Sequence, residues 1–288
     1  MGEVAVVIPV RDAAGLLGEC LTSIGAQAED TGATIIVVDD ASNDGSAAIA
    51  RSSGAEVIQL SKPRGPYAAR NMGWRHTNAD VIVFTDARCR ARPGWLVRSV
   101  DAIADGVAIA GADVWVRGGG GVASRAAHRQ QPLLASRSVN DRYLPFVATC
   151  SLATTRPVLE AVDGFLDVQS GGDVDFCWRV QRAGLGGVTV AEGAAMDWDA
   201  RRSLRALVGQ YRRYGRNTGW LQSRYGPLGC PADPVVPRWR GWGGAARSAL
   251  RSEPRSLDPR IVCADLLCRI AMYEGHRQTA GGIDGRST

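Results

Sequence analysis

The sequence predicts an α/β protein: a doubly wound, mostly parallel sheet with a C-terminal helical extension. Three observations predict this fold. Short apolar segments rich in Val and Ile recur through the first half of the chain, segments of helix-forming composition separate them, and two long helical patterns lie towards the C-terminus. Strands that are apolar without alternation are typical of sheets covered on both faces. The alternation of strands with helices is typical of a parallel sheet.

The first half of the chain contains four expected strands with helices between them. Ligands of such sheets bind beyond the carboxyl ends of the strands, so polar residues at those ends matter most for function. The expected strands are residues 4–9, 34–39, 56–60 and 81–86, and the expected helices are residues 14–27, 44–53 and 66–76.

The second half is less regular. A Gly-rich and basic stretch separates two further strands, and prolines, glycines and tryptophans interrupt the chain before the last helix. Asp173 is expected to cap a helix that ends at Gly184. The expected strands are residues 107–116 and 146–154, and the expected helices are residues 173–183, 203–221 and 259–276.

The composition is that of a soluble globular protein. The sequence is 45% hydrophobic and 22% charged, its net charge is +5, and Lys62 is its only lysine. No apolar run approaches the ~20 residues of a membrane span. The seven cysteines and three histidines show no zinc-ligand spacing, which argues against a structural zinc site. We expect a cytoplasmic protein with reduced thiols, and contact with the inner face of a membrane is left open.

Carboxylates follow three of the expected strands at the edge where ligands bind. Asp40 closes the second strand and Asp86 follows the fourth, and both come directly after apolar segments. A binding role is therefore favoured for these two residues. Asp12, Asn43 and Asp44 are interpreted as turn or cap residues, because Asp and Asn satisfy free backbone donors there.

Five segments occur in the order and spacing typical of a known family: VVIPVRD, VVDDASNDGS, RGPYAARNMGW, VIVFTDARC and GGDVDFCWR. Over about residues 4–221 the chain resembles family-2 glycosyltransferases. The resemblance implies the GT-A fold, a nucleotide-diphosphate sugar donor and inversion at the anomeric carbon. The expected organisation is a glycosyltransferase domain over residues 1–221 (donor half about 1–116, acceptor half about 117–221), an irregular and helical extension over 222–276 and a disordered tail over 277–288.

The resemblance implies a donor-binding role for several of these residues. Pro9 and Arg11 would line the nucleotide pocket. Because the family usually has an aromatic residue in the place of Arg11, stacking on the base would become a cation–π or phosphate contact. Asp40 would accept a hydrogen bond from an N–H group of the base. Arg70 would lie near the nucleotide, with a salt bridge on a helix face as its alternative role.

Asp86 corresponds to the first carboxylate of the Asp-x-Asp element that helps the family to hold Mg²⁺ or Mn²⁺ on the sugar diphosphate. Arg88 replaces the second carboxylate, and the segment MDWDARRSL lacks the histidine that many relatives have before the late helix. Either Arg88 takes over the charge of the cation, or Asp86, the diphosphate, water and Asp199 retain a divalent cation. The survival of Asp86 favours the retained cation.

The segment GGDVDFCWR contains the expected catalytic base. Asp173 corresponds to the aspartate that deprotonates the acceptor hydroxyl in the family, because an inverting transfer needs a carboxylate opposite the leaving diphosphate. Gly172 stands where the family usually has glutamate, and would let the backbone approach the acceptor closely. Asp175 and Trp178 are expected to shape the acceptor pocket or to pack the helix, and Cys177 is expected to lie in the core.

A set of arginines surrounds the late helix. We interpret it as a solvated helix face, with a diphosphate, an anionic acceptor or a membrane surface as alternative contacts. No aromatic platform accompanies these residues, so nucleic acid is not expected as a partner. The set comprises Arg201, Arg202, Arg205, Arg212, Arg213 and Arg216.

We therefore expect an enzyme that moves a glycosyl group from a nucleotide-diphosphate sugar to an acceptor hydroxyl with inversion. The acceptor is left open among a polysaccharide, a lipid-linked sugar, a peptide and a secondary metabolite. A catalytically silent sugar-nucleotide-binding protein is the main alternative, because Arg88 departs from the family pattern. A nucleotidyltransferase has less support, because PVRDAAGLLGE is a poor phosphate-binding loop.

Overall fold

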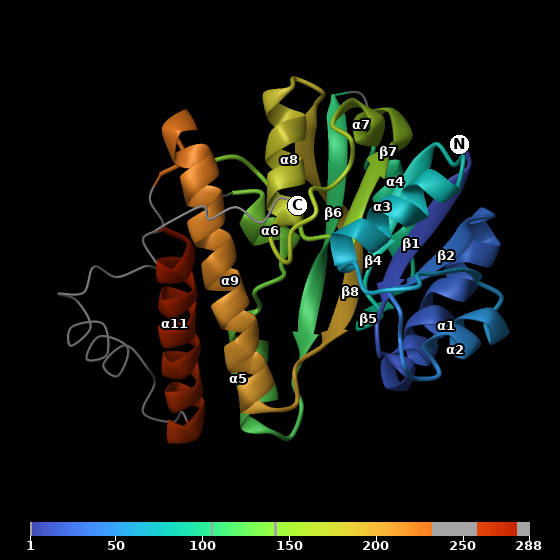
Figure 1. Ribbon diagram of the computed structural model, residues 1–288. Coiled ribbons are helices and arrows are strands. Elements are labelled where there is room, and N and C mark those ends of the chain that lie inside the picture. The colour runs from blue at the N-terminus through green and yellow to red at the C-terminus, as the bar shows by residue number, and fades with distance from the viewer. Residues whose placement is uncertain (1, 105, 141–142, 232–257, 281–288) are drawn as a thin grey trace. The chain divides into compact units, whose positions relative to one another are not determined.

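The chain forms two compact units in the computed structural model, which describes residues 2–104, 106–140, 143–231 and 258–280 (Figure 1). The first unit comprises residues 1–116 and 133–199, and the second unit comprises residues 117–132 and 200–288. All the expected donor, acceptor and base residues belong to the first unit. This unit therefore holds the candidate site.

An eight-stranded sheet forms the centre of the first unit. Its strands are β1 (Val4–Val10), β2 (Thr34–Asp39), β3 (Glu56–Gln59), β4 (Val81–Thr85), β5 (Cys89–Ala91), β6 (Val107–Arg117), β7 (Ser151–Thr155) and β8 (Gly187–Asp199). They lie in the order β3-β2-β1-β4-β7-β6-β8-β5. The first four strands of the chain pair in parallel, whereas β7 is antiparallel to β4 and β6, and β5 is antiparallel to β8. The expected parallel sheet is therefore present over β1 to β4, and the sheet is mixed beyond β4.

Strand β1 lies at the centre of the parallel part. Its residues Val6, Val7 and Ile8 are fully buried, which explains why this segment is apolar without alternation. The register pairs Val10 of β1 with Asp39 of β2. The segments that follow these strands therefore begin at the same edge of the sheet.

Helices flank the sheet (Figure 1). They are α1 (Ala14–Thr31), α2 (Ser46–Ser52), α3 (Pro66–His76), α4 (Trp95–Asp101), α6 (Ala135–Ser138), α7 (Arg156–Ala161) and α8 (Gly172–Arg182). Helix α3 packs on β1 and β2. It approaches them closely at Gly73, where a Cβ atom would overlap the Val7 side chain and lie 3.1 Å from Val38 Cγ2.

The expected elements of the second half differ in several places. The strand expected over residues 146–154 is shorter, because Val147 is instead buried in a loop and packs where Gly111 has no side chain. Strand β8 was not expected. Asp173 does not cap α8: the N-cap is Gly171, with φ of 79°, and Asp173 lies inside the first turn. Glycine takes this left-handed conformation without steric cost.

The second unit contains α5 (Val122–Gln130), α9 (Leu204–Tyr225), the short helix η1 (Gly226–Leu228) and α11 (Pro259–Ala280). Helices α9 and α11 lie side by side (Figure 1). Gly215 and Gly219 of α9 and Gly275 of α11 lie at the contact, where a Cβ atom would meet backbone of the facing helix. The small residues let the two helices approach closely.

The expected domain boundary after residue 221 lies near the end of α9, whereas the structure groups α9 and α11 in one compact unit. Because α9 packs on α11, it belongs to the same compact unit as the C-terminal helix. Residues 277–280, expected in a disordered tail, are the last turn of α11, and residues 281–288 lie outside the described residues. Most of the expected irregular segment, residues 232–257, also lies outside them.

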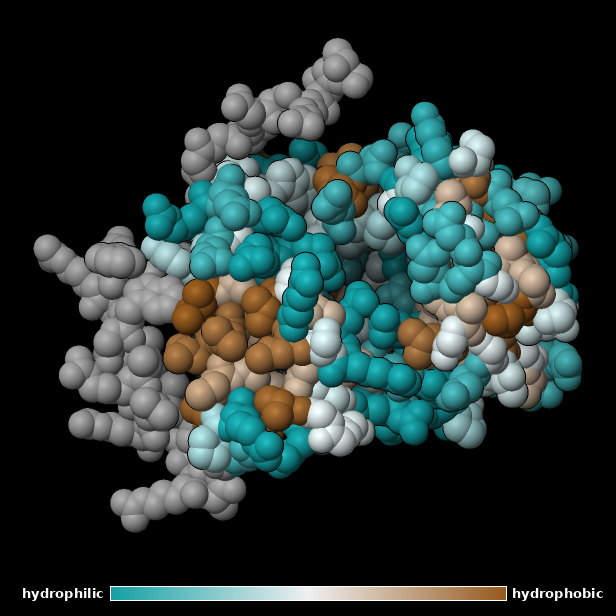
Figure 2. All heavy atoms as spheres, turned by 60° about the horizontal axis from the view of Figure 1, so that its bottom comes forward, coloured by the Kyte–Doolittle hydropathy of each residue, from teal (hydrophilic) through white to brown (hydrophobic). Residues whose placement is uncertain are grey.

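The second unit exposes part of its apolar surface. Figure 2 shows hydrophobic side chains gathered on one face of this unit, and Leu266 and Leu267 of α11 are 36% and 42% exposed. Within the described parts of the chain, no helix combines the length and the apolar character needed to cross a bilayer.

The close approach of α3 to β1 predicts a stability effect. Gly73→Ala should lower the free energy of unfolding by about 1–3 kcal/mol, because its methyl group has no space beside Val7. Gly18→Ala in α1 is the matched control. A Cβ atom at Gly18 meets nothing within 4 Å, so alanine there should be neutral or stabilising by up to about 1 kcal/mol. Denaturant unfolding measures both, and equal effects would contradict the packing of α3.

Candidate active site

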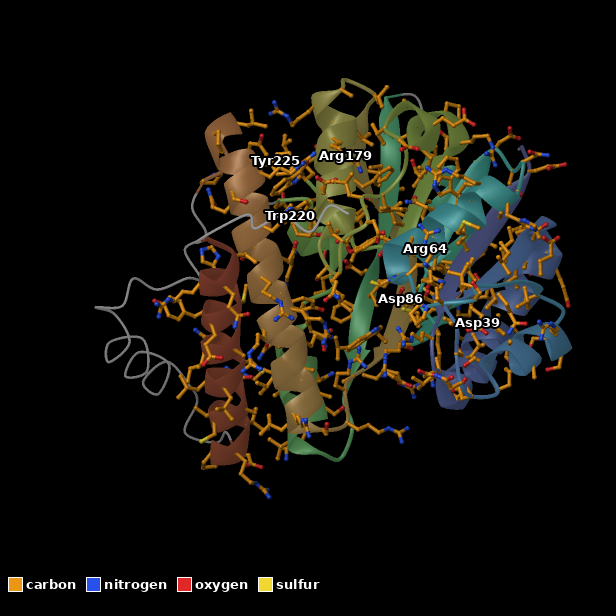
Figure 3. The ribbon with its side chains drawn as sticks, viewed as in Figure 1. Asp39, Arg64, Asp86, Arg179, Trp220 and Tyr225 are labelled. Carbon is orange, nitrogen blue, oxygen red and sulfur yellow. The ribbon has the colours of Figure 1, made fainter. Side chains whose placement is uncertain are left out.

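A pocket opens at the edge of the sheet where β1 and β2 end. It encloses about 280 Å³ and is lined by Pro9, Val10, Arg11, Asp40, Gly65, Pro66 and Gln169. Figure 3 shows Asp39, Arg64 and Asp86 in this part of the first unit. The expected donor residues Pro9, Arg11 and Asp40 are thus brought together by the ends of two neighbouring strands.

Asp40 is buried and fixes the loop that closes the pocket. One carboxylate oxygen accepts a hydrogen bond from the backbone N–H of Arg64 at 2.6 Å, and the other accepts one from Gly65 at 2.9 Å. Its own N–H donates to the carbonyl of Val10. A carboxylate oxygen has lone pairs for more than one donor. Asp40 can therefore order the loop before α3 and still accept a hydrogen bond from a ligand.

Gln169 is a lining residue that the sequence did not single out. It lies in the loop between α7 and α8, outside the quoted motifs. Its side-chain amide could hydrogen-bond a base or a sugar. Its place in the pocket depends on how this loop folds back over the strand ends, and no local sequence pattern encodes that.

Asp86 and Arg70 form an ion pair beside the end of β4. Arg70 Nη2 lies 2.5 Å from Asp86 Oδ1, and the Arg70 side chain is 4% exposed while that of Asp86 is 34% exposed. Arg70 Nε is buried and has no hydrogen-bond partner. Arg70 is therefore a fixed cation within the site, and the expected contact of Asp86 with a metal ion competes with this pair.

Arg88 and Asp199 lie near each other at the ends of β4 and β8. Arg88 Nη1 lies 3.5 Å from the backbone carbonyl of Asp199. The Asp199 carboxylate lies 2.7 Å from Nη1 of Arg90, which also pairs with Glu19. Partial burial acts to lower the pKa of Arg90, but its bonds to Glu19 and Asp199 raise it overall. Asp199 is therefore held by a permanent cation.

Asp173 lies in the first turn of α8 and accepts hydrogen bonds from three segments. Its Oδ1 accepts one from the Tyr67 hydroxyl and one from the Val174 N–H, both at 3.0 Å. Its Oδ2 accepts one from the Thr149 N–H at 3.3 Å. Gly172 packs against Tyr67. The carboxylate is thus oriented by α3, by α8 and by the loop before β7.

Asp175 and Trp178 make contacts that pack α8 in the first unit. The Asp175 side chain is completely buried and lies 2.7 Å from Arg179 Nε. Arg179, labelled in Figure 3, also donates to the carbonyls of Val162 and Gly164. Trp178 is buried and donates from Nε1 to the Leu144 carbonyl. Of the two expected roles, packing of the helix is the one that these contacts support.

Cys177 and the arginine set also have structural contacts. Burial raises the pKa of the Cys177 thiol to about 12, which is consistent with the expected core position and not with a nucleophile. Within the second unit, Arg212 pairs with Glu274 and Arg216 donates to Gln278. At least these two arginines therefore hold α9 to α11.

The described residues contain no group of three or more His, Cys, Asp or Glu side chains that could hold a metal ion. The carboxylates expected as ligands, Asp86 and Asp199, are each bonded to an arginine. Arg88 stands where a second ligand would be. The side chains of the site thus fit a divalent cation poorly.

The fold and the site together define a glycosyltransferase of the GT-A fold. The chain is similar to the mannosyltransferase PcManGT from Pyrobaculum calidifontis, solved in complex with GDP-Man and Mn²⁺. The TM-score is 0.68 and the identity is 16%, over 96% of this chain and 87% of that chain. The GT-A fold expected from the sequence is confirmed.

The chain belongs to glycosyl transferase family 2, whose model matches residues 5–161. It is 30% identical to the glycosyltransferase AglE of Haloferax volcanii over 77% of this chain and 75% of that protein. It is 29% identical to the pre-mycofactocin glycosyltransferase of Mycobacterium tuberculosis over 77% of this chain, and the match spans about half (48%) of that protein. The expected family and the expected class of enzyme are confirmed.

The pocket at Asp40 predicts an effect on ligand affinity. Asp40→Asn should weaken the binding of nucleoside diphosphates by about 1–3 kcal/mol, because it removes a charged hydrogen-bond acceptor from the pocket. Calorimetry with a panel of nucleoside diphosphates measures the change. Asp30→Asn, at the far end of α1 where the chain turns into β2, is the control and should bind normally. Unchanged affinity in the Asp40 variant would remove Asp40 from the donor site.

Proposed function

We propose that this family-2 glycosyltransferase transfers a sugar from a nucleotide-diphosphate donor to an acceptor hydroxyl with inversion. The observation that carries the proposal is the combination of one pocket and one carboxylate in the first unit. The pocket gathers Pro9, Arg11 and Asp40 at the strand ends. Asp173 presents an oriented carboxylate from the first turn of α8.

The proposed reaction is a single displacement. The acceptor oxygen attacks the anomeric carbon as the bond from that carbon to the diphosphate breaks, and Asp173 takes the proton of the acceptor hydroxyl. A base that removes this proton during attack makes the oxygen a better nucleophile. The donor nucleotide would be held by Pro9, Arg11 and Asp40.

The leaving diphosphate needs positive charge to stabilise it. Asp86 and Asp199 are occupied by Arg70 and Arg90, so their geometry supports the alternative in which arginine supplies this charge. We propose Arg88 for this role. A guanidinium suits a diphosphate because it donates two parallel hydrogen bonds. From the sequence, the presence of Asp86 favoured a retained cation. In the structure, however, the Asp86 carboxylate has Arg70 as its partner.

The role of Asp173 predicts a loss of turnover without a loss of binding. Asp173→Asn should cut turnover by roughly 10²–10⁴, the usual contribution of a positioned proton acceptor, and should leave donor affinity unchanged. Asp163→Asn is the control, because its side chain is 93% exposed and pairs only at the surface with Arg75. Release of nucleoside diphosphate, with and without acceptors, measures turnover across a donor panel.

Two outcomes would contradict this assignment. Near-normal turnover of Asp173→Asn would move the base elsewhere. Wild-type protein that binds donors tightly but shows neither transfer nor hydrolysis would instead support the silent sugar-nucleotide-binding protein.

The role of Arg88 predicts the response to a chelator. Activity should persist in excess EDTA, and Arg88→Ala should lose roughly 10²–10³ in turnover, the cost of removing one group that stabilises a developing charge. Arg51→Ala, an exposed arginine of α2 bonded to Gln59, should be unaffected. Activity that EDTA abolishes and Mn²⁺ restores would show instead that the cation is retained.

A further inference from the structure

Tyr67 contacts the candidate base from a helix that the sequence linked only to the donor. It is the second residue of α3 and is buried, 5% exposed. Its hydroxyl donates to Asp173 Oδ1 at 3.0 Å. Burial, and next the negative charge of Asp173, raise the pKa of Tyr67 well above its ordinary value, so the hydroxyl keeps its proton and remains a donor.

The Tyr67 ring also explains why residue 172 is glycine. A Cβ atom on Gly172 would lie 3.0 Å from each of three Tyr67 ring carbons. At this distance the ring would have to move by a few tenths of an ångström to admit a side chain at position 172. Glutamate, which the family usually has at this position, would therefore displace the ring. Tyr67 and Gly172 are thus a matched pair, in which an aromatic ring from α3 fills the place of a side chain from α8.

The ring is fixed from two further sides. The Phe165 ring lies 5.7 Å from it between centroids, and Cζ of Arg70 lies 5.2 Å from its centroid. Arg70 in turn pairs with Asp86. Tyr67 and Arg70 are three residues apart on α3, so one helical turn connects the carboxylate at the end of β4 with the candidate base of α8.

We propose that Tyr67 is a positioning residue for Asp173. It holds Oδ1 by its hydroxyl and thereby turns Oδ2 towards the acceptor hydroxyl, whose proton Oδ2 takes. The proposal rests on the proposed role of Asp173 as base. It assigns to this chain a tyrosine–aspartate pair in place of the glutamate–aspartate sequence that is usual in the family.

The test is Tyr67→Phe, which removes the hydroxyl and keeps the ring that packs on Gly172. Turnover should fall about tenfold or more, as expected for a lost hydrogen bond to a charged group, while donor KM stays unchanged. The acidic limb of the kcat/KM profile should move to higher pH, because the carboxylate loses a donor that favours its ionised form.

Few other groups near Asp173 could shift the pH profile by titrating. The thiols of Cys150 and Cys177 stay neutral, because the Cys89 contact and burial raise the pKa of Cys150 and burial raises that of Cys177 to about 12. The other charged groups of α3 and α8 are of two kinds. Arg70 pairs with Asp86 after β4, and Asp175 pairs with Arg179. The rest lie at the surface and contact partners away from Asp173: Arg75 contacts Asp163, His76 contacts Glu56 and Arg182 contacts Tyr143. A merely structural role of Tyr67 would lower the melting temperature and leave the pH profile in place.

Two further variants make the test independent of one substitution. Gly172→Ala should displace the ring and should also move the acidic limb of the profile to higher pH. This variant can therefore replace Tyr67→Phe in the test if Tyr67→Phe does not fold. In the Tyr67→Ala background the ring is absent, and Gly172→Glu should then be tolerated. Tyr143→Phe is the matched control, because its hydroxyl bonds Arg182 at an exposed position.

The outcomes separate this proposal from the proposed function. If Asp173→Asn is inactive while Tyr67→Phe keeps its turnover within twofold and its pH profile, Tyr67 does not position the base and Asp173 remains the base. If Asp173→Asn is active, the function proposed for Asp173 fails first. A pH shift in Tyr67→Phe and Gly172→Ala, and none in Tyr143→Phe, would support the pair.

Discussion

The close packing of α3 against β1 at Gly73 is the constraint on which the site depends. Because residue 73 has no side chain, the helix lies directly on Val7 and Val38. Three polar or aromatic residues on the preceding turns are then within reach of other elements. Tyr67 reaches Asp173, Arg70 reaches Asp86, and Asn71 exchanges two hydrogen bonds with the backbone of Phe165. A longer distance between helix and sheet would break all three contacts together.

The ion pairs of the first unit give the site its electrostatic character. Asp86, Asp199 and Asp175 are each bonded to an arginine, and two of these arginines, Arg70 and Arg90, lie near the strand end that carries Arg88. A carboxylate that is already paired with a guanidinium binds a divalent cation less readily than an unpaired carboxylate does. The proposed contact between Arg88 and the diphosphate of a sugar donor is consistent with this arrangement.

In the proposed site, glycine at position 172 replaces the glutamate that is usual in the family, and Tyr67 contacts the candidate base Asp173. The orientation of Asp173 is supplied by a hydroxyl from α3, by the Thr149 N–H and by its own helix. Each donor comes from a different segment, and together they bond both carboxylate oxygens, so the side chain is held in one orientation. The packing of Tyr67 on Phe165, which also contacts Phe84 and Phe176, ties this arrangement to the core.

The sequence alone determined the features that depend on local pattern. Continuous apolar segments marked β1, β2 and β4, because strands buried on both faces leave no room for alternation. Five motifs in order identified the family. The rule that ligands bind at the carboxyl ends of parallel strands predicted a shared site for Pro9, Arg11 and Asp40, and these residues do line one pocket. Only the tertiary structure decided the partners of these residues. Asp175 and Trp178 lie on the same short segment as Asp173, yet their helical phase points them into the core. The pair of Asp86 with Arg70 joins residues 16 apart in the sequence, and the pair of Tyr67 with Asp173 joins residues 106 apart. Gln169 lies still further along the chain from Pro9 and Asp40, with which it lines the pocket. Such contacts depend on how a helix lies on a sheet and how a loop returns over it, and local spacing carries no information about either.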